Sequence, residues 1–230
     1  SIIQAHNLCL TTLTRNPDHL AHLTEGKDYE KFVVNGEELY FVKQHVKPSL
    51  LSQLLTAWLN CRKQIRRTMA VTEDPSIKTI LDKKQAAIKV TCNSVYGFTG
   101  AAGGYLPCLE VAATVTTVGR RMLDATKCFI EERWGTDVSA LQADFPDASL
   151  DGSGSTYAMS IVYGDTDSVF VKGVGISAAC LRQIGPQIAE KITGALFTPP
   201  IKLECEKVFD KLLLIKKKKY IGLIEKKMMM

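Results

Sequence analysis

The sequence predicts an α+β fold in which an antiparallel sheet is interrupted by a helical hairpin. Three observations indicate this class. Runs of β-branched and aromatic residues flank turn signals both early and late in the chain, and between them apolar residues recur at three- and four-residue spacing. With 230 residues and 46% hydrophobic content, the chain can also bury a substantial core. Strands, a helical excursion and strands again are typical of an α+β domain with an antiparallel sheet.

Two segments carry the pattern of a β-hairpin, with strand-like residues on both sides of a turn signal. Residues 32–42 turn at Asn35-Gly36, which is a strong signal for a two-residue hairpin turn. In residues 157–171, Gly164 is expected to mark the join between the two strands.

Between these hairpins the sequence predicts two helices joined by a short polar break. The first opens at Pro48 and continues to about Met69, and the second runs from Ser76 to near Gly97. Because the helices are of similar length and the break is short, they are expected to form an antiparallel helical hairpin with charged outer faces.

The rest of the chain is expected to add two more helices and two short strands. Residues 135–156 are expected to be irregular, with the Gly- and Ser-rich residues 151–155 as a flexible linker. The helices are predicted over residues 109–134 and 177–194, and the strands over residues 201–203 and 212–215.

Composition excludes several classes of protein. No apolar run approaches the roughly 20 residues of a membrane span, and the N-terminus lacks the pattern of a signal peptide. The seven cysteines include no C-x-x-C pair, so buried free thiols in a reducing compartment are expected rather than zinc. The four histidines have no ligand spacing to one another and are interpreted as structural.

The net charge of +5 is modest, but the basic residues are clustered in a way that suits a polyanionic partner. A solvated helix face is the alternative for some of them, and a lysine tetrad can also act as a localisation signal. The clusters are Arg62, Lys63, Arg66, Arg67, Lys83, Lys84 and Lys89, and Lys216 to Lys219.

Asp165 and Asp167 lie one residue apart within Tyr163–Ser168, between two strand-like runs. Carboxylates held this close repel each other unless a cation neutralises them. Hard cations such as Mg²⁺ or Mn²⁺ suit this role when phosphate oxygens complete their coordination shell. The alternative is a polar hairpin turn with solvated charges.

Lys89 and Asn93 are four residues apart on the second predicted helix and therefore share a face. Arg62 and Arg66 repeat this spacing on the first helix, and guanidinium groups bind phosphate oxygens in pairs. The two helices are thus expected to hold a triphosphate from both sides. The alternative is a pair of basic helices whose charges are merely solvated.

Three ordered motifs resemble those of family B DNA polymerases. Lys89–Gly97 matches K-x-x-x-N-S-x-Y-G, Tyr163–Ser168 matches Y-G-D-T-D-S, and Lys217–Tyr220 is similar to K-K-x-Y. Further segments resemble the herpesvirus members of the family, and the resemblance fails only in residues 135–156 and at the C-terminus. These segments are Ser1–Cys9, Ala86–Ile88 and Pro200–Lys207.

The resemblance implies a polymerase palm, formed by residues 1–47 and 98–230, with a fingers hairpin inserted at residues 48–97. It implies DNA-directed DNA synthesis in viral replication in the host nucleus, with two Mg²⁺ ions, primer-template DNA, deoxynucleoside triphosphates and a processivity subunit bound outside this segment. The implied residues are Asp165 and Asp167 for metal, with Asp167 as the more direct ligand; Lys89 for catalysis; Arg62, Arg66, Lys89, Asn93 and Tyr96 for nucleotide; and Gly97, Thr166, Lys217, Lys218 and Tyr220 for DNA.

The resemblance also implies that the chain is a fragment. The first family motif runs D-F-x-S-L-Y-P-S-I-I, and Ser1-Ile2-Ile3 matches only its end. A third metal-binding carboxylate and the tyrosine that excludes ribonucleotides are therefore expected before Ser1, as are the exonuclease before this segment and the thumb after it. Glu204 and Glu206 are weaker candidates for a supporting carboxylate, and both are interpreted first as surface charge.

Two other functions would present some of the same residues. A metal-dependent nuclease also pairs aspartates near lysines, but it has no need of a triphosphate-binding helix, so dependence on nucleotides separates it from a polymerase. A non-catalytic nucleic-acid-binding module would bind duplex DNA without metal. The segment by itself is expected to be inactive, because two carboxylates one residue apart cannot alone hold two ions.

Overall fold

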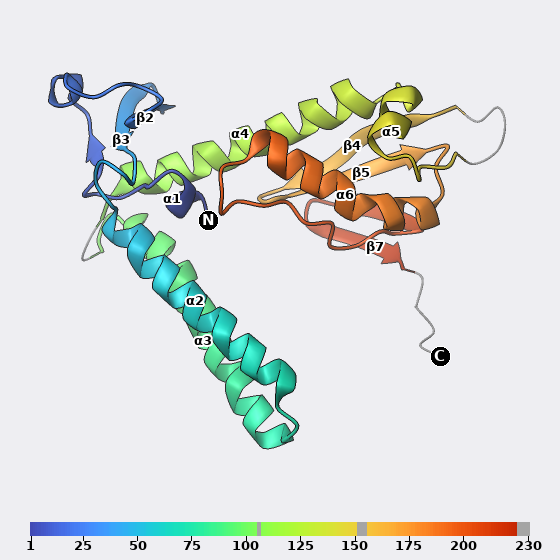
Figure 1. Cartoon of the computed structure of the whole chain (residues 1–230), viewed down its shortest axis with the longest axis horizontal. Coiled ribbons are helices and arrows are strands. Elements are labelled where there is room, and N and C mark those ends of the chain that lie inside the picture. The colour runs from blue at the N-terminus through green and yellow to red at the C-terminus, as the bar shows by residue number, and fades with distance from the viewer. Residues whose placement is uncertain (105–106, 151–155, 225–230) are drawn as a thin grey trace. The chain divides into compact units, whose positions relative to one another are not determined.

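The computed structural model describes residues 1–104, 107–150 and 156–224, and the chain divides into two compact units, Ser1–Val118 and Gly119–Met230. Both units combine helices with antiparallel strands, as predicted (Figure 1). The described strands form three separate antiparallel sheets rather than the single sheet expected. The reason is that each late hairpin pairs only with itself, so the strands do not continue into a common sheet.

The first unit begins with short helical turns and a three-stranded sheet in the order β1-β3-β2. Asn35 and Gly36 both have positive φ, of 53° and 86°, which gives a tight turn that matches the twist of a hairpin. The first predicted hairpin is therefore confirmed. The elements are α1 (Ile2–Ala5), β1 (Leu13–Thr14), the 3₁₀ helix η1 (Pro17–Leu20), β2 (Tyr29–Val34) and β3 (Glu37–Val42).

Two long helices, α2 (Leu50–Val71) and α3 (Pro75–Thr99), form the predicted antiparallel hairpin (Figure 1). The Ser49 hydroxyl caps α2 by accepting a hydrogen bond from the Ser52 amide. Asp74 caps α3 in the same way, and Pro75 occupies the first turn, where no amide hydrogen is needed. The Asp74 cap thus fixes the end of the short break between the helices, and the Ser49 cap fixes the start of the hairpin.

The base of this hairpin is held by a small apolar cluster. Leu51 and Leu55 of α2 pack with Val95 of α3 and with Ile3 and Cys9 from the start of the chain. The outer half of the hairpin has little further cover, since most of its residues between 60 and 91 are exposed. The hairpin therefore presents its side chains to solvent or to ligands.

The second unit contains most of α4, which crosses the boundary between the units, and two β-hairpins with a helix between them. The helices predicted over residues 109–134 and 177–194 are confirmed within two residues. The elements are α4 (Leu109–Trp134), α5 (Val138–Asp144), β4 (Ala158–Asp165), β5 (Ser168–Val174), α6 (Ala178–Leu196), β6 (Lys211–Lys216) and β7 (Lys219–Leu223).

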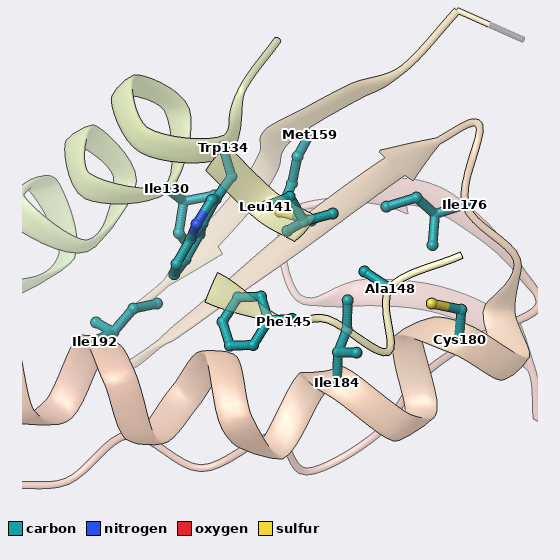
Figure 2. Close-up of a cluster of buried hydrophobic side chains, with 10 residues drawn as sticks. All are labelled: Ile130, Trp134, Leu141, Phe145, Ala148, Met159, Ile176, Cys180, Ile184 and Ile192. Carbon is teal, nitrogen blue, oxygen red and sulfur yellow. The ribbon is translucent and has the colours of Figure 1, made fainter. Parts of the chain in front are cut away.

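The core of this unit joins the end of α4 to α5, β4 and α6, as Figure 2 shows. Trp134 lies between Phe129 and Phe145, with ring centroids 5.5 and 5.3 Å away. Met159 reaches this cluster from β4, and Ile184 reaches it from α6. One face of the β4–β5 hairpin is thereby attached to the helices.

Two expectations for the later elements are wrong. Residues 135–156 contain α5, because Asp137 caps a helix by accepting hydrogen bonds from the amides of Ser139 and Ala140, and Leu141 then enters the core. Residues 201–203 form no strand, because the Leu203 amide donates to the Thr193 hydroxyl at 2.9 Å instead of to another strand. The linker expected at residues 151–155 lies outside the described residues.

A single carboxylate, Asp144, joins three helices. Its side chain is 9% exposed and accepts hydrogen bonds from Arg133 Nε at 2.5 Å and Trp134 Nε1 at 2.9 Å, and it also pairs with Lys191. The Arg133 guanidinium, with help from Lys191 and Trp134, holds the pKa of Asp144 well below its ordinary value against the opposing effect of burial. Asp144 is therefore charged in the folded protein.

The cysteines are all free, but only some are buried. Cys9, Cys108 and Cys180 are buried, whereas Cys61, Cys128 and Cys205 are exposed, so the expectation of buried thiols is wrong for these last three. Among the described residues, no helix has both the length and the apolar character needed to cross a membrane.

Candidate functional site: an acidic turn and a basic helical hairpin

The acidic turn joins β4 to β5. Asp165 pairs with Ser168 at the end of the ladder, and Thr166 and Asp167 form the two-residue turn, with Thr166 at φ 55°. Gly164 does not mark the join as expected: it lies inside β4 and pairs with Val169. The tight turn brings the two aspartates to the tip of the hairpin.

Hydrogen bonds around the turn fix Asp165 more firmly than Asp167. Thr166 Oγ1 donates to Asp165 Oδ1 at 3.1 Å, and the Ser168 hydroxyl donates to the Asp165 carbonyl oxygen at 3.2 Å. Asp167 is exposed, and within the described part of the chain its carboxylate accepts no hydrogen bond. Both side chains thus keep oxygen atoms that can coordinate a hard cation.

The β6–β7 turn is held beside this acidic turn. The Lys218 amide donates to the Tyr163 hydroxyl at 2.8 Å, and Lys218 Nζ lies 3.7 Å from Asp165 Oδ1. Lys217 and Lys218 form the turn itself, with Lys218 at φ 65°. The second and third motifs, more than 50 residues apart in sequence, therefore meet in space.

An aromatic cluster keeps the two hairpins together. Phe170 of β5 lies at the centre, with ring centroids 5.4 Å from Tyr163 and 5.0 Å from Tyr220. Phe209 stacks on Phe170 at 6.4 Å with an interplanar angle of 12°. Phe170 and Phe209 were not predicted from the sequence, because both lie outside the motifs. Only the fold shows that these two rings connect the two hairpins.

The helical hairpin contains a polar contact within its seam. Arg62 Nε of α2 donates to Gln85 Oε1 of α3 at 3.0 Å, and Gln85 Nε2 donates to Asp82 at 3.0 Å. Arg62 is half-buried as a result, so it holds the helices together in addition to any contact with a ligand. Gln85 was missed in the sequence, although it lies one helical turn before Lys89 and on the same face.

This contact locates the other basic residues on one flank. Arg66 lies four residues after Arg62 on α2, and Lys89 lies four residues after Gln85 on α3. A step of four residues turns a side chain by about 40° around the helix axis, in the same sense on both helices. Antiparallel helices are related by a two-fold axis perpendicular to their common plane, so equal rotations lead to the same flank. Arg66, Arg62, Lys89 and Asn93 thus follow one another along this flank, with Arg66 nearest the tip.

Tyr96 and Gly97 lie near the base of α3. The Tyr96 hydroxyl is 3.1 Å from the Thr116 hydroxyl of α4, and the residue as a whole is 42% exposed. A methyl group added at Gly97 would meet no atom within 4 Å. The packing of the chain therefore does not require a glycine at this position. A glycine there is also unfavourable, because it destabilises a helix by about 1 kcal/mol relative to alanine.

The expected site residues fall into two groups, one in each unit. Asp165, Asp167, Thr166 and the Lys217–Tyr220 turn are brought together in the second unit, and the nucleotide-binding candidates share a flank in the first. Glu204 pairs with Lys202, as expected for surface charge. In residues 1–104, 107–150 and 156–224, no three or more His, Cys, Asp or Glu side chains are grouped to hold a metal ion.

Comparison with known proteins identifies the class. Residues 1–229 match the family described as DNA polymerase family B, so the chain belongs to this family. In fold it resembles the family B DNA polymerase of the archaeon Pyrobaculum calidifontis, with a TM-score of 0.59 and 22% identity over 97% of this chain and 24% of that one.

More similar relatives are the DNA polymerase catalytic subunits of herpesviruses. The chain is 54% identical to that of Psittacid herpesvirus 1, covering 100% of this chain and 21% of the relative. It is 53% identical to that of varicella-zoster virus strain Dumas, covering 97% and 19%. The chain thus spans about a fifth of the length of these relatives.

Proposed function

We propose that this chain is the palm and fingers segment of a herpesvirus-type DNA-directed DNA polymerase, which adds deoxynucleotides to a primer 3′-hydroxyl. The observation that carries the proposal is the meeting of the acidic Y-G-D-T-D-S turn with the lysine turn of the K-K-x-Y motif. A polar hairpin with solvated charges would not need a second basic hairpin bonded to it. The relatives' name as polymerase catalytic subunits supports the same reaction.

Asp165 and Asp167 are proposed to hold two divalent cations, Mg²⁺ or Mn²⁺, with Asp167 as the more direct ligand because its carboxylate is exposed and unengaged among the described residues. Such ions, when bound, lower the pKa of the primer hydroxyl and neutralise the leaving pyrophosphate. The protein's own part is to present the two carboxylates on a rigid turn. Thr166 orients Asp165 through its hydrogen bond and is proposed to contact the primer end.

The basic flank of the α2–α3 hairpin is proposed to bind the triphosphate of the incoming nucleotide. Arg62, Arg66, Lys89 and Asn93 supply charged and amide donors along one line, which suits a chain of phosphate groups. Lys89 is further proposed to stabilise or protonate the leaving pyrophosphate. Tyr96 would pack at the new base pair, where the open space at Gly97 leaves room for it.

The lysine turn is proposed to follow the primer-template duplex. Lys217 and Lys218 stand at the tip of the β6–β7 hairpin, and the Lys218 side chain is 65% exposed, so its ammonium group is accessible to phosphate as well as to Asp165. Tyr220 fixes this hairpin to β5 through Phe170. By the same resemblance, the intact enzyme would act in the host nucleus with a processivity subunit bound outside this segment.

The decisive test is the substitution Asp167→Asn in a full-length polymerase that carries this segment. Nucleotide addition is expected to be abolished in a primer-extension assay with Mg²⁺, while the Kd for primer-template DNA stays within about twofold, because the carboxylate contacts metal rather than duplex. Extension at the normal rate by this variant would refute the assignment. Metal-dependent DNA degradation that needs no nucleotide would favour a nuclease instead.

A further inference from the structure

Hydrogen bonds attach the start and the outer edge of β4 to the C-terminal end of α4. Just before the strand, the Tyr157 hydroxyl donates to the Trp134 carbonyl at 2.5 Å. Within the strand, the Met159 amide donates to the Gly135 carbonyl at 2.8 Å, and the Ile161 amide donates to a side chain, Glu131 Oε1, at 3.1 Å. The last two bonds satisfy amides that an edge strand would otherwise leave unpaired.

The Glu131 contact lies at a break in the strand pairing. Ile161 pairs with Val171 and Tyr163 with Phe170, so Val162 is an extra residue that makes a β-bulge. Asp165 follows the bulge by three residues. The side-chain period of a strand is two, so the bulge sets which face of the hairpin each later residue occupies.

Glu131 holds the last amide before this bulge. The Met159 amide has a backbone carbonyl, that of Gly135, as its acceptor. The Ile161 amide instead has the Glu131 carboxylate as its acceptor. A charged acceptor makes a stronger bond to an amide than a neutral one. Without it, the amide next to the bulge loses its partner and the bulge is free to shift.

We propose that Glu131 is a positioning residue for the metal-binding turn: by anchoring the bulge at Ile161, it fixes the register from which Tyr163, Asp165 and Asp167 project. This inference rests on the proposed polymerase function. Glu131 acts through the backbone and touches neither metal nor DNA. Its contribution is to placement, and a misplacement of about 1 Å in an active site can reduce a rate by about 100-fold.

The test uses full-length polymerase with Glu131→Gln, which keeps an acceptor at the same reach, and Glu131→Asp, which keeps the charge but is shorter by one methylene. Glu131→Asp is expected to lower kcat by about 10- to 100-fold, with the Kd for primer-template DNA and the KM for nucleotide nearly unchanged. Glu131→Gln is expected to remain within about threefold of the original enzyme, since its amide oxygen is a somewhat weaker acceptor. Exposed Glu132, the next residue of α4, provides the matched control Glu132→Ala, for which no effect is expected.

Three results would overturn the inference. These are a normal kcat for Glu131→Asp, a Glu131→Gln variant as slow as Glu131→Asp, or an equal loss of DNA binding and rate, which would indicate general unfolding. Thermal unfolding and circular dichroism of each variant identify that last case directly. Asp167→Asn in the same experiment separates the two proposals: if the original enzyme extends a primer and Asp167→Asn does not, a normal Glu131→Asp refutes only the role of Glu131.

Discussion

Some charged residues of this chain stabilise the fold, and others are available to bind a ligand. Asp144 is nearly buried and has three partners, so its charge holds α4, α5 and α6 together. Lys89 is exposed and pairs with no acidic side chain among the described residues, so its charge is available to a ligand. The difference predicts opposite consequences when each is removed.

Asp144→Ala is expected to destabilise the second unit by about 1–3 kcal/mol, because Trp134 Nε1 loses its acceptor inside the core. The pKa of Asp144 is lowered in the folded protein, so its contribution is complete above the ordinary carboxyl pKa of about 3.9, declines progressively as pH falls below that value, and is gone only below the lowered pKa of the folded state. Thermal unfolding at pH 7 and at pH 3 measures this. A difference between variant and original protein that is as large at pH 3 as at pH 7 would contradict the role of the charge, and Asp147→Ala, at an exposed position nearby, is the control.

Lys89→Ala is expected to raise the KM for deoxynucleotides by about 10- to 100-fold, since a charge-assisted hydrogen bond contributes about 1.5–3 kcal/mol. Duplex affinity should hardly change, as the residue lies on the flank assigned to nucleotide. Lys84→Ala is the matched control, because Lys84 is about 140° away around the same helix. Equal effects of the two substitutions on KM would show that the flank has no special role.

At the scale of elements, the catalytic candidates depend on how the two hairpins of the second unit are joined. The β4–β5 and β6–β7 hairpins share no strand pairing in the described residues and meet through Phe170, Phe209, Tyr163 and Tyr220. Aromatic pairs of this kind add about 0.5–1.5 kcal/mol each beyond burial. Small changes at the contact should therefore separate the lysine turn from the acidic turn.

Gly222→Ala tests this contact. A methyl group at Gly222 would lie 2.2 Å from Phe209 Cδ1, so the ring must leave its stack on Phe170. We expect a loss of about 1–3 kcal/mol in stability, typical of overpacking, and weaker duplex binding by the full-length enzyme. Gly194→Ala in α6 is the control, because a methyl group there meets nothing within 4 Å and should be neutral or stabilising.

At the scale of the whole molecule, the proposed activity needs groups from both units. The turn proposed to bind metal belongs to Gly119–Met230 and the flank proposed to bind nucleotide belongs to Ser1–Val118, with α4 running from one unit into the other. Asp165 and Asp167 are also too few to complete two near-octahedral coordination shells. Catalysis is thus expected to need both units together with further metal ligands.

The 230-residue chain alone is therefore expected to bind DNA weakly, with a Kd in the micromolar range or above that rises steeply with salt, and not to extend a primer. Filter binding at several salt concentrations and a primer-extension assay with Mg²⁺ and deoxynucleotides measure both properties. A chain carrying Asp165→Asn and Asp167→Asn is the control for extension. Template-directed synthesis by the chain that this control lacks would show that a third carboxylate lies within it, with Glu204 and Glu206 the first to examine.

The sequence by itself determined the elements whose signals are local. The Asn35-Gly36 turn, the capped helices α2 and α3 and the strands around Asp165 all follow from residues within one turn or one strand of each other. Helix α5 was missed although its cap at Asp137 is local, because the surrounding Gly, Ser and Pro residues favour irregular structure. Family membership also follows from short ordered motifs.

Only the tertiary structure decided how these elements are used. It gave Arg62 a partner in Gln85, brought Lys218 beside Asp165, and made Glu131 the acceptor for Ile161. Each of these contacts joins residues 23 to 53 positions apart in the chain. Local sequence patterns cannot encode such pairs, because they arise from packing of elements whose positions depend on the burial of the whole core.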